Sequence, residues 1–176
     1  KRREIGVPID CNLLISVGEL SVRKNHKVVV DALQSLPEDY WYVIVGKGDL
    51  KEELEQMDKT GRLKLLGFRI DIKELLWASD LFVFPSLQEG LPVALMEAMA
   101  AGVPCVISRI RGNVDLIKNE RLMFDATDKQ SCQKAIKQSS QEITQETSYL
   151  RQSISTYDGR LINKTIERIY QQLAKK

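Results

Sequence analysis

The sequence predicts an α/β fold, with helices on both faces of a doubly wound, mostly parallel sheet of six strands. Two observations lead to this prediction. The candidate strands are continuously apolar, as strands buried on both faces are, whereas half-exposed antiparallel strands alternate in polarity. They also alternate with helical patterns along the chain, which is the order of a sheet wound in both directions. The 176 residues, 43% of them hydrophobic, suit one domain that spans residues 1–176.

Six apolar runs are expected to be the strands, several of them rich in β-branched and aromatic residues. They cover residues 12–18, 40–45, 63–68, 81–85, 103–108 and 121–125. The run at residues 81–85 is the most apolar of the six.

Helical periodicity separates these runs. Helices are expected at residues 25–36, 49–60, 71–78 and 92–101, in a short stretch after Gly112, and in two or three stretches after Asp128 that end with residues 158–173. Asp71 and Glu74 are expected to form a capping box at the start of the third helix. Pro92 suits the first turn of the fourth, because its missing amide hydrogen would be unpaired there anyway.

Composition and charge argue against several classes of function. The formal net charge is +2, from 26 basic and 24 acidic residues scattered along the chain, so no footprint for nucleic acid or an anionic bilayer stands out. No stretch approaches 18 uninterrupted apolar residues, so no membrane span is predicted. Three widely separated cysteines suit a reducing compartment, and the cytoplasm is the expected location.

The beginning of the sequence resembles neither a natural start nor a signal peptide. The first residue is Lys rather than Met, and no apolar segment follows the basic residues. We therefore expect a fragment of a longer protein, whose missing part could attach it peripherally to the inner face of a membrane.

Glycines and small polar residues follow the predicted strands. In open α/β sheets, ligands bind beyond the carboxyl ends of the strands. Gly18, Gly46, Gly67 and the loop at residues 86–90 fall at these ends, so Gly18 and Ser86 are candidates for contact with a substrate. Glycine at such a position can also serve only to relieve strain in a turn.

Glu97 is the one charged residue in the otherwise apolar helix at residues 92–101. We therefore expect its carboxylate to be at least partly buried, whichever face it occupies. An ionised carboxylate there costs several kcal/mol unless it is paired or richly hydrogen-bonded. Its donors could be the hydroxyl groups of a bound sugar, or an internal Lys, Arg or backbone amide.

Glu89 lies eight residues before Glu97, in the loop that leads into the same helix. It could simply interact favourably with the positive end of the helix. The free amides of that helix point back towards Gly90 and Leu91, which makes the loop a natural site for an anion. A sugar nucleotide would use such a set, with its diphosphate on the amides, its ribose on one acid and its sugar on the other.

PSLQEGLPVALMEAMAAGVPCVIS, at residues 85–108, resembles the E-x7-E signature of the retaining glycosyltransferases of the large group-4 family, which have GT-B architecture. VGKGDL, LGF and SDLFVFPS are similar to companion motifs of that family, and the match runs from about Leu13 to Phe124. The resemblance implies that the chain is the Rossmann-like, donor-binding, C-terminal half of such an enzyme, without its N-terminal acceptor domain. VGEL followed by KNH, and SRIRGNVDLI, are similar to members that build bacterial capsular and extracellular polysaccharides.

The resemblance assigns roles to the residues of the signature. It implies that Glu97 binds the ribose hydroxyls and that Glu89, as a catalytic residue, holds hydroxyls of the donor sugar near the bond that breaks. The amides of Gly90 and Leu91 would take the diphosphate.

Lys24 matches the family's phosphate-binding lysine, which would offset the charge that builds on the leaving nucleotide. The nucleobase would lie near Phe68 and Arg69 and be read largely by backbone. The sequence departs from the family at Glu19, where many members have an arginine that reaches the diphosphate. Either Glu19 faces elsewhere and Arg23 or Lys24 supplies the charge, or phosphate binding is weakened.

Other polar residues are weaker candidates. His26, the only histidine, follows Asn25, a helix-cap candidate, and is expected to be structural. Arg109 and Arg111 could reach a donor or acceptor, although surface arginines are common. No D-x-D pair occurs, so no metal is expected, and the resemblance implies no cofactor apart from a donor substrate, commonly a uridine diphosphate sugar.

The resemblance implies transfer of a sugar, with retention, from a nucleotide diphosphate sugar to a saccharide or lipid-linked acceptor. The isolated chain is expected to bind nucleotide weakly and to be inactive. Two alternatives stay open. One is a non-catalytic module that binds nucleotide sugars, which Glu19 favours, and the other is a nucleotide-sugar epimerase of the same architecture.

Overall fold

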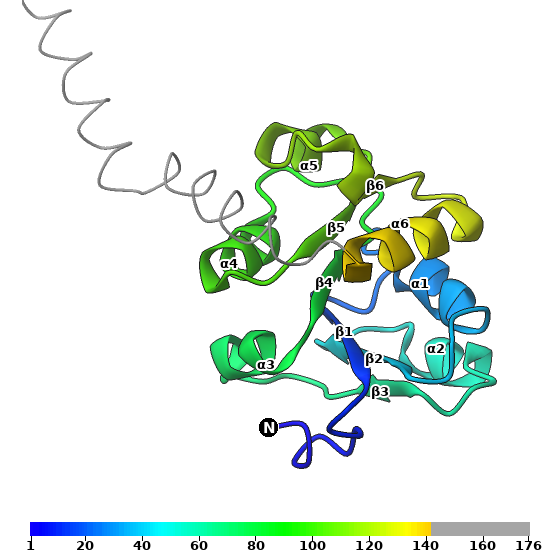
Figure 1. Ribbon diagram of the computed structural model, residues 1–176. Coiled ribbons are helices and arrows are strands. Elements are labelled where there is room, and N and C mark those ends of the chain that lie inside the picture. The colour runs from blue at the N-terminus through cyan, green and yellow to red at the C-terminus, as the bar shows by residue number, and fades with distance from the viewer. Residues whose placement is uncertain (142–176) are drawn as a thin grey trace, which may run out of the picture.

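The computed structural model describes residues 1–141, which form a six-stranded sheet covered by helices on both faces (Figure 1). The strand order is β3-β2-β1-β4-β5-β6, and every neighbouring pair of strands is parallel. The strands are β1 (Asn12–Val17), β2 (Tyr40–Val45), β3 (Leu63–Leu65), β4 (Leu81–Phe84), β5 (Cys105–Ser108) and β6 (Met123–Phe124). The predicted Rossmann-like α/β fold is confirmed, and the strand order reverses between β1 and β4.

The helices lie in two layers. They are α1 (His26–Leu33), α2 (Lys51–Met57), α3 (Ile72–Ala78), α4 (Val93–Ala101), α5 (Arg111–Leu116) and α6 (Lys129–Gln141), with a 3₁₀ turn η1 (Glu120–Leu122) before β6. Figure 1 shows α3 and α4 on one side of the sheet and α1, α2 and α6 on the other. None of the helices within residues 1–141 is long and apolar enough to cross a membrane. The helix predicted at residues 158–173 lies outside the described residues.

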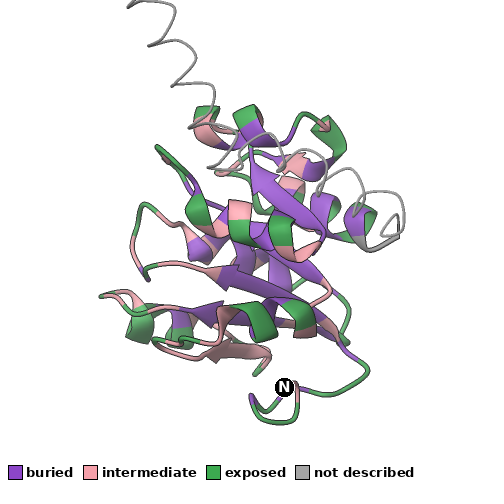
Figure 2. Ribbon diagram, turned by 90° about the vertical axis from the view of Figure 1, so that its left-hand side faces the viewer, coloured by how far each residue is buried: buried purple, intermediate pink, exposed green. Residues whose placement is uncertain are grey.

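Alternate residues of the central strands enter two separate cores. Along β1, Leu13 and Ile15 pack in the core under α3 and α4, whereas Leu14 packs in the core under α1 and α6. Figure 2 shows the strands of the sheet interior as buried along their length. Burial on both faces is the reason that the strands are apolar without alternation.

Glycine is required where β2 ends beside β1. A Cβ atom on Gly46 would lie 1.8 Å from the carbonyl oxygen of Gly18, a distance that no side chain could tolerate. Gly46 also bridges Gly67, whose φ of 67° lies in the left-handed region. This turn ends β3 at Leu65, three residues before the predicted end.

The capping box predicted at α3 does not form. Asp71 occupies the position before the helix, but its side chain makes no capping hydrogen bond. Its carboxylate instead accepts from Arg69 Nη2 at 2.6 Å and from Lys1 Nζ at 2.7 Å, contacts that hold the pKa of Asp71 below its usual range. Basic side chains brought near by the fold compete for the carboxylate, and a pattern within the helix alone does not reveal them.

Candidate functional site

Two loops meet at the carboxyl edge of the sheet, one after β1 and one after β4. They lie together because β1 and β4 are neighbours in the sheet. The amide of Leu87 donates to the carbonyl of Arg23 at 2.8 Å. Asn25, with a left-handed φ of 53°, does not cap α1 with its side chain but donates to the carbonyls of Pro85 at 3.1 Å and Ala126 at 2.8 Å. These hydrogen bonds fix the loop that carries Glu89.

Lys24 and Glu89, the two predicted catalytic residues, form an ion pair across these loops. Lys24 Nζ lies 2.7 Å from Glu89 Oε1, and the two side chains are 14% and 5% exposed. Lys24 Nζ also lies 5.1 Å from the centre of the Phe84 ring. Arg23 Nη1 lies 3.5 Å from Glu89 Oε2. The fold therefore gathers two cations and one nearly buried carboxylate at the end of β4.

Gly18 has a steric role beside this pair. A Cβ atom at Gly18 would come within 3.3 Å of both Cδ and Cε of Lys24. Glycine leaves room for the lysine stem to run back towards Glu89.

Glu97 is exposed, so the expectation that it is at least partly buried is wrong. It lies on one face of α4 with Val93 and Ala100, which are also exposed, while Leu95 and Met99 turn inward. Valine and alanine side chains are apolar but do not mark a buried face. The argument that burial forces a ligand to supply donors therefore fails for Glu97, because water can satisfy an exposed carboxylate.

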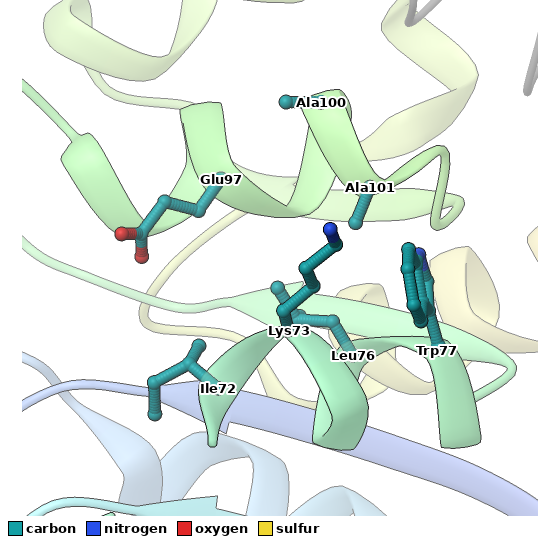
Figure 3. Close-up of a pocket in the computed structure, with 7 residues that line it drawn as sticks. All are labelled: Ile72, Lys73, Leu76, Trp77, Glu97, Ala100 and Ala101. Carbon is teal, nitrogen blue, oxygen red and sulfur yellow. The ribbon is translucent and has the colours of Figure 1, made fainter. Parts of the chain in front are cut away.

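Glu97 nevertheless lines a cavity of about 440 Å³ between α3 and α4. The lining residues are Ile72, Lys73, Leu76, Trp77, Glu97, Ala100 and Ala101. Figure 3 shows the Glu97 side chain extending towards the Ile72 end of this cavity, away from Lys73 and Trp77. Among residues 1–141 no hydrogen bond or ion pair engages its carboxylate. The internal Lys, Arg or amide partner considered as an alternative is therefore not seen there.

Phe68 and Arg69 follow β3 at the same edge of the sheet. Phe68 is 71% exposed. The Arg69 guanidinium is held by Asp71, with Nε to Oδ1 at 2.7 Å, and by Glu4, with Nη2 to Oε1 at 2.5 Å. The arginine side chain is thus engaged by two carboxylates.

The loop before α4 combines one buried residue with two exposed ones. Ser86 is fully buried, and its carbonyl accepts a hydrogen bond from Ser108. Gly90 and Leu91 are exposed and line a second cavity of about 460 Å³ beside α5. Pro92 immediately precedes α4, within one residue of the predicted start.

Three further residues support this loop and were not singled out as site residues from the sequence: Ser108 at the end of β5, and Gly112 and Asn113 in α5. Ser108 Oγ donates to the carbonyl of Ser86 at 2.5 Å, and Asn113 Nδ2 donates to Ser108 Oγ at 3.0 Å. A Cβ atom on Gly112 would lie 2.9 Å from the carbonyl oxygen of Glu89. The sequence did contain a signal for these supporting residues, namely small polar residues at the end of a strand. That signal can be interpreted only when the strand order shows that this strand lies next to β4.

His26 is a buried structural residue, as expected. Its Nε2 lies 3.2 Å from the carbonyl oxygen of Glu19, and its Nδ1 lies 3.1 Å from the hydroxyl of Tyr42, which donates to Ser16. Burial lowers the pKa of His26 to about 4. The side chain of Glu19 is exposed, and the basic side chains that contact Glu89 are those of Lys24 and Arg23.

The remaining candidates are Arg109 and Arg111, which lie next in sequence to Ser108 and Gly112. Arg109 pairs with Glu120 at 3.1 Å on the surface, and Arg111 is exposed at the start of α5. Within the described part of the chain, no group of three or more His, Cys, Asp or Glu side chains is placed to hold a metal ion. Cys11, Cys105 and Cys132 are buried, and no disulfide joins them in the described part of the chain.

Comparison with known proteins decides the family. The profile of the family described as "Glycosyl transferases group 1" matches residues 1–152. The chain belongs to this family.

Two solved structures share the fold of this glycosyltransferase domain. Anabaena HepE in complex with UDP and glucose gives a TM-score of 0.82 at 23% identity, covering 99% of this chain and 51% of that one. Sucrose-phosphate synthase from Thermosynechococcus elongatus gives a TM-score of 0.84 at 22% identity, covering 99% and 48%. The fold is that of GT-B glycosyltransferases.

Relatives of this glycosyltransferase domain occur among bacterial proteins named for polysaccharide synthesis. The Escherichia coli protein named UDP-Gal:alpha-D-GlcNAc-diphosphoundecaprenol alpha-1,3-galactosyltransferase is 40% identical over 130 residues, which are 68% of this chain and 34% of that protein. The amylovoran biosynthesis glycosyltransferase AmsK of Erwinia amylovora is 38% identical over 121 residues, which are 60% and 30%. The chain thus spans about a third of the length of these relatives.

Proposed function

We propose that this chain is the donor-binding, C-terminal half of a glycosyltransferase. The enzyme would move a sugar from a nucleotide diphosphate sugar to a saccharide or lipid-linked acceptor, with retention of configuration. The observation that carries the proposal is the Lys24–Glu89 pair at the carboxyl edge of the sheet, immediately before Gly90 and the start of α4. A cation, a carboxylate and free backbone amides at one place suit a sugar diphosphate.

We assign each part of the donor to a group of residues at this edge. The diphosphate would lie against Lys24 and the amides of Gly90 and Leu91. Glu97, with no partner among residues 1–141, would accept hydrogen bonds from the ribose hydroxyls. The base would lie near Phe68 and the backbone of Arg69. The donor sugar would then lie by Glu89.

Orientation and charge stabilisation would drive the reaction. As the bond to the diphosphate breaks, negative charge builds on the leaving group, and the Lys24 ammonium would offset it. Glu89 would fix the sugar through its hydroxyls, so that the developing oxocarbenium-like centre faces the acceptor. The donor is a substrate in this scheme, and we propose no separate cofactor.

The names of the relatives suggest the pathway. The Escherichia coli relative is named for a UDP-Gal donor and a diphosphoundecaprenol-linked acceptor, and the Erwinia relative for amylovoran biosynthesis. We extend to this chain a uridine diphosphate sugar, a role in polysaccharide biosynthesis, and a second, acceptor-binding domain of the same protein. The three reduced cysteines suit the cytoplasm, with peripheral attachment to the inner face of the membrane through that domain.

Thermal shifts of the full-length protein with uridine, guanosine and adenosine diphosphates test the donor site. A ligand at 100 times its dissociation constant should stabilise the protein by about 2.7 kcal/mol. We expect uridine diphosphate to give the largest shift and Glu97→Gln to reduce it sharply without unfolding the protein. Glu74→Gln, which removes an exposed carboxylate from the neighbouring helix α3, is the matched control. An unchanged shift in Glu97→Gln would remove the ribose role.

A transfer assay separates the proposal from its alternatives. Full-length protein incubated with labelled nucleotide sugars and a lipid-linked acceptor should give an elongated acceptor. A binding module would retain the nucleotide sugar without product, and an epimerase would convert the donor itself. Either of these results would replace the transferase proposal.

A further inference from the structure

The Lys24–Glu89 pair presents a conflict for the proposed function, on which this inference rests. The donor needs Lys24 on its diphosphate and Glu89 on its sugar, yet in the free protein each neutralises the other at 2.7 Å. The contact is close and nearly buried, so it is a strong competitor for the lysine. A diphosphate can pair fully with the Lys24 ammonium group only if the contact between Lys24 and Glu89 weakens.

A nearly buried carboxylate cannot be left alone when its lysine moves. Glu89 is 5% exposed, and a charge in such a place is costly without a partner. Arg23 is the available substitute. Its Nη1 already lies 3.5 Å from Glu89 Oε2 and 3.4 Å from the carbonyl oxygen of Gln88, and its side chain is 48% exposed and therefore has room to move closer.

We propose that Glu89 is an internal counter-anion that holds Lys24 until a diphosphate displaces it, and that Arg23 is a positioning residue that keeps Glu89 neutralised and in place afterwards. Arg23 would thus act through Glu89 and not on the phosphates. The exchange places the carboxylate beside the sugar only when the diphosphate is bound. In protein without bound nucleotide, Lys24 would stay paired with Glu89.

The proposal makes an unusual prediction for Glu89→Gln. This substitution should abolish transfer but tighten the binding of uridine diphosphate. Uridine diphosphate lacks the donor sugar, so it loses no contact when the Glu89 carboxylate is removed. By isothermal titration calorimetry we expect Kd to fall about fivefold or more, or about 1 kcal/mol. Glu53→Gln is the matched control, because it removes the carboxylate of the exposed Lys27–Glu53 pair, and it should leave Kd unchanged.

A double-mutant cycle tests the role of Arg23. Arg23→Gln should weaken binding of uridine diphosphate about threefold in the wild-type background, since Glu89 then retains Lys24 more tightly. Arg23→Lys keeps the positive charge and should retain most of the wild-type affinity. In the Glu89→Gln background, Arg23→Gln should have no effect. An equal loss in both backgrounds would show that Arg23 contacts the phosphates directly, and it would overturn the positioning role.

The outcomes separate this inference from the proposed function. If wild type binds uridine diphosphate but Glu89→Gln binds it no more tightly, the counter-anion is wrong while the donor site stands. If wild type binds none of the uridine, guanosine and adenosine diphosphates, both proposals fail. Should Glu89→Gln not fold, Glu89→Asp keeps the charge but draws it back from Lys24, and a Kd that is unchanged or higher than in wild type would contradict the inference.

Discussion

Lys24 couples the stability of the fold to the chemistry of the site, because its partner Glu89 is nearly buried. Lys24→Met leaves Glu89 with Arg23 alone, so we expect the free energy of unfolding to fall by about 1 to 3 kcal/mol. Transfer should fall by about 100-fold or more, as it does when one charge-stabilising donor is lost. Urea denaturation and steady-state kinetics measure the two effects.

Lys27→Met is the control for that substitution. It breaks the pair with Glu53, whose side chains are far more exposed, and surface pairs contribute only about 0 to 1 kcal/mol. It should leave transfer unchanged. Equal losses of stability in the two variants would contradict the burial of Glu89.

His26 should make the stability of the protein depend on pH. Its pKa is about 4 in the fold, because burial disfavours the charged ring, and about 6.5 in an unfolded chain. Between these values the unfolded chain binds a proton that the folded chain does not. Stability should therefore be complete above about pH 6.5 and fall by up to about 3 kcal/mol as the pH drops towards 4.

Urea denaturation at pH 7 and pH 4.5 measures this loss. The carboxylates whose pKa is lowered in the fold, Glu4, Asp58, Asp71 and Asp125, contribute little between these two pH values, because their unfolded forms begin to bind protons only near an ordinary carboxyl pKa of about 4. His26→Gln should be less stable at pH 7 but should lose much less between the two pH values. An equal loss in the variant would assign the pH dependence to other groups.

Sequence patterns identified both glutamates of the signature, but the burial expected for Glu97 is found instead at Glu89, for which none was predicted. Glu97 stands among apolar neighbours in the sequence and is exposed, whereas Glu89 stands among polar ones and is nearly buried. Burial of Glu89 depends on the loop after β1, and its partner Lys24 is 65 residues away. Contacts between distant residues follow from the strand order, which local patterns do not contain.

At the scale of elements, α5 supports the loop that carries Glu89 through a close approach of its backbone at Gly112. Gly112→Ala places a Cβ 2.9 Å from the carbonyl oxygen of Glu89 and 3.2 Å from that of Gly90, so the loop must shift. We expect transfer to fall about tenfold, because small displacements of a positioned group are costly to catalysis. The melting temperature should change little, and full activity in the variant would show that the loop position is not critical. Kinetics and thermal denaturation check both.

The elements themselves could be predicted well, but their ends could not. β4 follows from an uninterrupted apolar run, because burial on both faces leaves a local signal, whereas the half-buried edge strand β3 contains Lys64. The end of β3 depends on the pairing of Gly67 with Gly46, and the cap of α3 on the competition of Arg69 and Lys1 for Asp71. These are interactions between segments, which periodicity does not report.

At the scale of the whole molecule, the proposed function divides the work between two domains. The chain spans about a third of the length of its relatives, and we place the acceptor site in the remainder. The isolated 176 residues should therefore bind uridine diphosphate weakly and transfer no sugar. Calorimetry and a labelled-donor assay on this chain and on the full-length protein test this, and clear transfer by the isolated chain would contradict the division.

The most direct test of the account is a crystal structure of the full-length protein with uridine diphosphate. We expect the diphosphate at Lys24 and at the amides of Gly90 and Leu91, the ribose hydroxyls within hydrogen-bonding distance of Glu97, and Lys24 drawn away from Glu89. A nucleotide bound elsewhere, or at this edge without contact to Lys24 and Glu97, would contradict the account.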